Sequence, residues 1–72
     1  MDQRWIIDLL RLNTRIIVVE ARLVARVTDI VAREACGQDT SETGSLLIGD
    51  RKMLCLLRRL RDLMLDEVVD QD

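Results

Sequence analysis

The sequence predicts an all-α fold, a long antiparallel hairpin of two helices, and three observations lead to this prediction. The 72 residues contain no proline, phenylalanine or tyrosine, and they are rich in residues that favour helices, such as leucine and arginine. Polar residues recur along the first half at helical spacing. Only one segment, residues 37–44, has the composition of a turn. We therefore expect helices at about 3–36 and from Ser45 or Asp50 to about 69, in a single domain.

The first predicted helix is defined by a continuous polar stripe. Its members recur every three, four or seven residues, as on one face of a helix; they are Asp8, Arg11, Arg15, Arg22, Arg26, Asp29 and Arg33. The β-branched run at residues 16–19 (IIVV) is the one place where a strand competes. A strand would scatter the polar residues over both faces, so the periodicity favours the helix.

The turn is predicted at residues 37–44 (GQDTSETG), a polar segment bracketed by glycines. Gly37 suits the left-handed conformation that ends many helices. Ser45 and Asp50 are both suitable caps for the second helix, and Gly49 between them leaves that start open by several residues. The acidic end, residues 70–72, opposes the helix dipole and is expected to fray.

The first helix carries an apolar arc that is wider than a coiled-coil seam. With Ile6, Asn13, Glu20, Val27 and Glu34 at heptad position a, two adjacent apolar rows follow. Position d holds Leu9, Ile16, Leu23 and Ile30, and position e holds Leu10, Ile17, Val24 and Val31. Trp5, Leu12 and Val19 add a further flank.

The second helix is expected to cover only part of this arc. Its predicted packing face consists of Met53, Leu56, Leu57, Leu60, Leu63, Met64 and Val68. Another chain should cover the remaining apolar surface. We therefore expect the hairpin to pair with a second copy as a four-helix bundle, or with a different helical protein.

Asn13 and Glu20 interrupt the apolar arc one heptad apart, where burial without a partner is unfavourable. One interpretation is that they determine register and oligomeric state, with Arg59 or Arg61 pairing with Glu20. The other is that they reach solvent at the edge of the bundle. The sequence leaves both interpretations open.

A domain of this size usually needs disulfides, a metal or oligomerisation for stability. With no histidine and only Cys36 and Cys55, we expect no metal site and no cofactor, and we expect the cysteines to be small buried side chains. No secretory leader or long apolar run is visible, so we expect a cytoplasmic chain with reduced thiols and no membrane contact. Oligomerisation is the remaining means of stabilisation.

The sequence offers little for catalysis, so we expect no enzyme and no small-molecule substrate. It has no histidine, tyrosine or glycine-rich phosphate loop, and the carboxylates Asp62, Asp66 and Glu67 are typical of a solvated helix face. One local feature favours nucleic-acid binding, a basic cluster on the second helix that consists of Arg51, Lys52, Arg58, Arg59 and Arg61. Against it stand the net charge of −2 and the acidic residues that follow.

The sequence therefore predicts a non-enzymatic protein-interaction module, such as a homodimeric adaptor, co-chaperone, inhibitor or regulator. Its predicted interface lies on the first helix and comprises Trp5, Ile6, Leu9, Leu10, Leu12, Asn13, Ile16, Ile17, Val19, Glu20, Leu23, Val24, Val27, Ile30 and Val31. One alternative is a small RNA- or DNA-binding regulator that uses the basic cluster. Another is an obligate subunit of a larger helical assembly.

Overall fold

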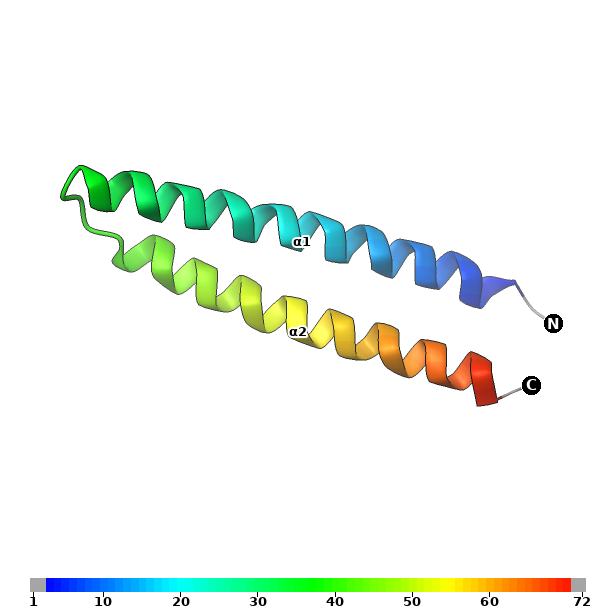
Figure 1. Ribbon diagram of the computed structural model, residues 1–72. Helices are drawn as coiled ribbons and strands as arrows, with labels where there is room; N and C mark the ends of the chain where they lie inside the picture. The colour runs from blue at the N-terminus through cyan, green and yellow to red at the C-terminus, as the bar shows by residue number, and fades with distance from the viewer. Residues whose placement is uncertain (1–2, 71–72) are drawn as a thin grey trace.

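The computed structural model describes residues 3–70 and confirms the all-α hairpin. Helix α1 spans Arg4–Ala35 and helix α2 spans Ser41–Asp70. The two helices run antiparallel, so the first turn of α1 and the last turn of α2 lie together at the end of the hairpin opposite the turn (Figure 1). The molecule is a rod of 56 × 15 × 13 Å. Its radius of gyration, 16.7 Å, exceeds the value of about 11 Å that is typical of a compact domain of this length.

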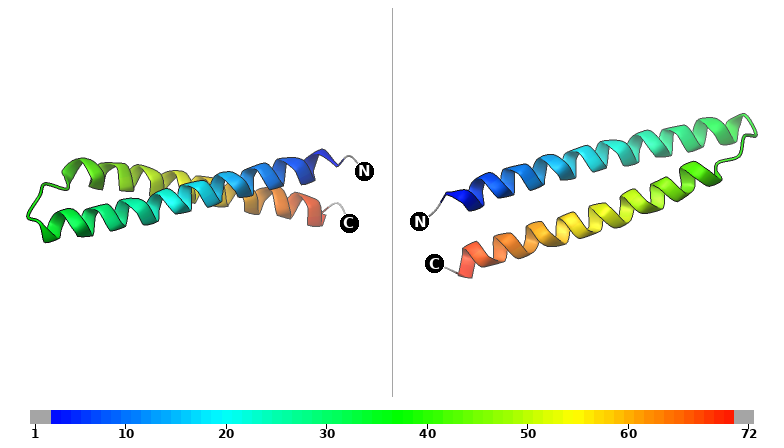
Figure 2. Two further views of the ribbon diagram at one scale, coloured as in Figure 1. Left: turned by 90° about the horizontal axis from the view of Figure 1, so that it is seen from above. Right: turned by 180° about the vertical axis from the view of Figure 1, so that it is seen from behind.

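The core is a single seam between the two helices. Its buried members are Leu12, Ile16, Val19, Leu54 and Leu57, against which Leu23 and Met64 pack. The seam residues of α1 are spaced alternately by four and three, which is the spacing of a coiled coil, and those of α2 follow the same pattern when the half-buried Arg61 is included. This spacing suits two long helices that cross at a shallow angle, as Figure 2 shows in the view from above.

The end of α1 has the predicted left-handed glycine. Gly37 has φ of +71°, and its amide donates to the carbonyl of Glu34 at 3.0 Å. The amide of Gln38 donates to the carbonyl of Arg33 at 2.8 Å. These two bonds form a Schellman motif, which satisfies carbonyls that the end of a helix would otherwise leave free.

Helix α2 begins at Ser41, earlier than the predicted start at Ser45 or Asp50. Asp39 explains the difference, because its Oδ1 accepts hydrogen bonds from the amide (3.0 Å) and the hydroxyl (2.6 Å) of Ser41. Glu42 adds favourable negative charge to the first turn. Gly44 and Gly49 are tolerated inside the helix. At the other end α2 extends to Asp70, and residues 71 and 72 of the predicted frayed end lie outside the described residues.

The hydrogen bonds at Asp39 predict a pH-dependent cap. The Ser41 hydroxyl, followed by the Ser41 amide, lowers the pKa of the Asp39 carboxyl below its ordinary value. Because this pKa is lowered on folding, the cap stabilises the hairpin above the ordinary pKa, and its contribution is lost as the pH falls through the lowered value. An NMR titration of the Asp39 carboxyl carbon should show a low midpoint. Ser41→Ala should raise that midpoint; an unchanged midpoint would contradict this account.

The predicted packing face of α2 is partly wrong. Leu57 and Met64 lie on the seam, but Leu54, which was not predicted, is buried beside Leu57. The predicted contacts Met53, Leu56, Leu60 and Leu63 are exposed, and the side chain of Val68 lies outside the described residues. The reason is that two of the half-buried positions along the seam are polar, Asp50 and Arg61. The apolar periodicity of α2 is therefore stronger in the exposed row beside the seam than in the seam itself.

The predicted burial of the cysteines is also wrong. Cys36 and Cys55 are both free and exposed. Cys36 caps the end of α1, where the chain leaves the helix. Cys55 lies one position after the buried Leu54, so its side chain points away from the seam.

Candidate protein interface

A row of exposed apolar side chains runs along α1. We call it the α1 row and define it by Leu10, Ile17, Val24 and Val31, which are 61%, 64%, 67% and 61% exposed. Each lies one position after a buried or half-buried residue of α1, in order Leu9, Ile16, Leu23 and Ile30, so the row is turned by about 100° from the side that faces α2. Ile6 and Val27 extend it and are also exposed. A continuous apolar stripe of this kind on a protein surface is a candidate interaction site.

The structure divides the predicted interface between two surfaces. Seven residues are buried or half-buried on the side of α1 that faces α2: Trp5, Leu9, Leu12, Ile16, Val19, Leu23 and Ile30. The others, apart from the half-buried Asn13, are exposed: Ile6, Leu10, Ile17, Glu20, Val24, Val27 and Val31. Both sets share the same periodicity, so the sequence did not indicate which of them α2 would cover.

Asn13 and Glu20 both find partners on α2. Arg61 donates to the side-chain oxygen of Asn13 at 3.3 Å, and Arg58 lies 3.5 Å from the carboxylate of Glu20. The expected partners of Glu20 were Arg59 or Arg61, so this detail is corrected. The Glu20 and Arg58 side chains are 47% and 49% exposed, which makes their pair a weak one at the edge of the seam.

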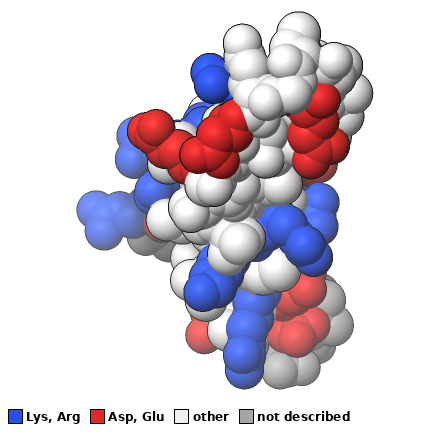
Figure 3. Space-filling model, turned by 90° about the vertical axis from the view of Figure 1, so that its left-hand side faces the viewer, with Lys and Arg blue, Asp and Glu red and all other residues white. Residues whose placement is uncertain are grey.

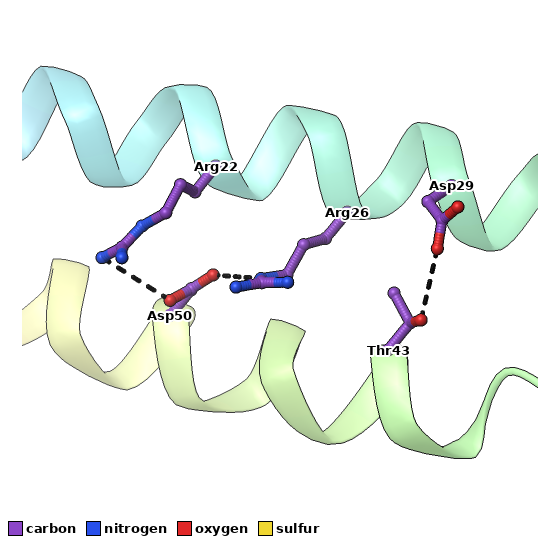
Figure 4. Close-up of polar contacts among 5 residues, drawn as sticks. All are labelled: Arg22, Arg26, Asp29, Thr43 and Asp50. Atoms are coloured by element: carbon purple, nitrogen blue, oxygen red, sulfur yellow. Dashed lines mark hydrogen bonds and ion pairs between the residues drawn. The ribbon is translucent and has the colours of Figure 1, made fainter.

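A polar layer closes the seam towards the turn (Figure 4). Arg26 Nε lies 2.5 Å from Asp50 Oδ2, and the guanidinium of Arg22 lies 3.8 Å from the other oxygen of the same carboxylate. Farther along, the hydroxyl of Thr43 donates to Asp29 at 3.2 Å. The carboxyl of Asp50 is only 13% exposed, so this layer opposes any shift of α2 along α1.

The predicted nucleic-acid cluster is split by the fold. Arg58 and Arg61 are engaged with Glu20 and Asn13 across the seam. Arg51, Lys52 and Arg59 line a shallow pocket of about 560 Å³ whose other walls are Ile48, Cys55 and Leu56. At the turn end, acidic and basic side chains both flank an uncharged surface (Figure 3). Three of the five predicted basic residues are therefore brought together, around an apolar floor.

Within residues 3–70, no group of three or more histidine, cysteine, aspartate or glutamate side chains is placed to hold a metal ion. Neither helix, over its described length, has an apolar stretch sufficient to cross a bilayer. The predicted carboxylate cluster of Asp62, Asp66 and Glu67 is exposed on α2.

The surface area of the chain is large for its mass. It exposes 5795 Å². A compact monomer of 8.3 kDa would expose about 4,600 Å², so the hairpin has an excess of about 1,200 Å².

Comparison with protein-family models, curated proteins and solved structures finds no match to this chain.

Proposed function

We propose that this chain is a non-enzymatic protein-binding hairpin whose α1 row packs against a second copy of the chain to form a four-helix bundle. The observation that carries the proposal is the α1 row itself, four apolar side chains at heptad spacing, each more than 60% exposed. In water such a row is unfavourable, and covering it with another apolar row is the simplest way to remove it from solvent.

A second copy suits the α1 row because the row is symmetric. Its four members are evenly spaced by seven residues, so a two-fold axis near the middle of α1 brings two antiparallel rows into contact over their whole length. Polar interruptions do not prevent this contact. Asn13 and Glu20 already have partners in their own hairpin, so neither enters the interface as an unpaired group.

The available area supports the same occupant. Stable protein interfaces bury about 800 Å² on each partner. The excess surface of the hairpin, about 1,200 Å² relative to a compact monomer of its mass, is enough to supply that area. A homodimer of this kind would also supply the stabilisation that a single seam of five buried side chains lacks.

Light scattering combined with circular dichroism tests the proposal. We expect a helical species of twice 8.3 kDa, and we expect Ile17→Lys/Val24→Lys to give a monomer because two charges would be buried in the interface. The matched control, Ile7→Lys/Val18→Lys, adds the same charge at exposed apolar positions outside the α1 row and should leave the mass unchanged.

Two results would contradict the proposal. A well-folded wild-type monomer at tens of micromolar would show that the chain does not form the proposed homodimer. Equal masses for the two double variants would show that the α1 row is not the contact. A wild-type chain that is largely unfolded when purified alone would instead identify an obligate subunit of a larger assembly.

Nucleic-acid binding is the second candidate, and one observation favours it. Arg51, Lys52 and Arg59 gather around one pocket and form no ion pair or hydrogen bond among residues 3–70. A salt-sensitive gel shift of labelled RNA or DNA that disappears in Arg51→Gln/Lys52→Gln/Arg59→Gln would support this function over the homodimer.

A further inference from the structure

The face of the hairpin opposite the α1 row carries a second apolar strip beside a row of arginines. On α1, the positions just before the seam residues hold Arg11, Arg15, Val18 and Arg22. On α2, the positions just before the buried or half-buried residues Leu47, Leu54, Leu57, Arg61 and Met64 hold Leu46, Met53, Leu56, Leu60 and Leu63. In an antiparallel pair, these positions lie on the same side of both helices. A recess of about 170 Å³ lined by Arg15, Val18, Arg22 and Met53 confirms that the two rows adjoin.

The apolar part of this face is long and exposed. Leu46, Met53, Leu56, Leu60 and Leu63 are each between 41% and 64% exposed, and Val18 across the recess is 52% exposed. The α2 residues extend over roughly 25 Å along the helix at 1.5 Å per residue. A strip of that length parallel to the groove between two helices matches the side of one further helix.

The charge of this face is positive in its middle. Arg11 and Arg15 form no hydrogen bond or ion pair among residues 3–70. Arg22 is 51% exposed, and its partner Asp50 lies 3.8 Å away and also pairs with Arg26. Acidic residues flank this region, with Asp8 and Glu67 towards the open end and Asp29 towards the turn.

We propose that this second face binds an amphipathic helix of another protein that carries acidic residues beside its apolar stripe. The partner's leucine-like side chains lie on the strip from Leu46 to Leu63, and its carboxylates pair with Arg11, Arg15 and Arg22. These arginines are separated by four and seven residues, so carboxylates at positions i, i+4 and i+11 of the partner helix match them.

A second copy is a poor occupant of this face. A two-fold axis that stacks α1 on α1 places the two rows of arginines against each other, and one that stacks α1 on α2 places arginines on the leucines. A nucleic acid is also disfavoured, because the strip is apolar, contains no aromatic side chain and is bounded by acidic residues. The surface instead has the composition of a groove for an acidic helix.

Two designed peptides test the proposal with the full chain. One is a labelled helix of about 21 residues with leucines at heptad spacing and glutamates at i, i+4 and i+11, long enough to form a helix on binding. The other has glutamine in place of each glutamate. Fluorescence anisotropy should give about tenfold tighter binding of the glutamate peptide, with the advantage reduced at high salt.

Substitutions on the second face test whether the peptide binds there. Arg11→Gln/Arg15→Gln should abolish the preference for the glutamate peptide, and Met53→Lys should weaken both peptides because it places a charge in the strip. Arg51→Gln/Arg58→Gln removes the same charge at positions just after Asp50 and Leu57, on the α1-row side of the hairpin, and should change neither. Ile17→Lys/Val24→Lys should still bind the peptide, so failure of this inference is separate from failure of the homodimer.

Three results would overturn the inference. The first is equal affinity for the two peptides. The second is a preference that survives Arg11→Gln/Arg15→Gln. The third is displacement of the peptide by single-stranded RNA or by vesicles of anionic lipid, with the same dependence on Arg11 and Arg15; this would show a general anion-binding surface.

Discussion

Replacing Ile16 with alanine is expected to lower the free energy of unfolding by about 2–5 kcal/mol, which is enough to unfold most of the chain. Ile16 is 2% exposed and lies at the centre of the seam, between Leu12 and Val19 on its own helix. Truncation removes buried apolar surface and leaves a cavity that two straight helices cannot easily close. Thermal unfolding followed by circular dichroism, at a fixed protein concentration, measures the loss.

Val18→Ala is the matched control for this experiment. Val18 lies two residues away on the same helix and is 52% exposed, and alanine has the higher helix propensity. We expect a change within about 0.5 kcal/mol. If both variants lost the same stability, the seam would not be the main source of folding energy.

Replacing Asp50 with leucine is expected to destabilise the hairpin by about 1–3 kcal/mol. The reason is that the Arg26 side chain, 27% exposed, would keep its charge at the seam without its 2.5 Å partner. The cost should be lower than for a fully buried pair, because water reaches the guanidinium of Arg26 and Arg22 is half exposed. Denaturant unfolding at fixed concentration measures it.

The double variant Arg26→Leu/Asp50→Leu tests whether the instability of Asp50→Leu comes from the unpaired charge of Arg26. Both positions are half-buried, so two leucines extend the apolar contact and should restore or exceed wild-type stability. We expect a lower specificity of helix alignment, visible as broader amide resonances near residues 43–50. A double variant as unstable as Asp50→Leu would show that the ion pair itself supplies net stability.

The two surface proposals rest on one structural fact, that each helix has a second apolar row next to the seam. On α1 this row follows the seam residues, and on α2 it precedes them. In an antiparallel hairpin the two rows therefore emerge on opposite faces. The α1 row adjoins the mixed charges of α2, whereas the α2 strip adjoins the arginines of α1, so the two faces suit different partners.

The amino-acid sequence by itself determined the fold class, the length of α1 and the position of the left-handed glycine. These follow from local chemistry: helix propensity, polar periodicity and the low steric cost of positive φ at Gly37. The sequence also indicated that α1 has more apolar surface than one neighbouring helix can cover. It misplaced the start of α2, because the cap at Asp39 competes with two later serine and aspartate caps that are equally good in composition.

Only the tertiary structure decided which of the adjacent rows is buried. On each helix, the buried row and the exposed row beside it have the same apolar periodicity, so periodicity does not tell them apart. The buried rows also contain the half-buried polar residues Arg26, Asp50 and Arg61. These residues are acceptable there because each meets a partner from the other helix, and such a pairing depends on contacts distant in sequence. For the same reason, the exposed α1 row and the opposite α2 strip became recognisable as separate surfaces only once the two helices were aligned.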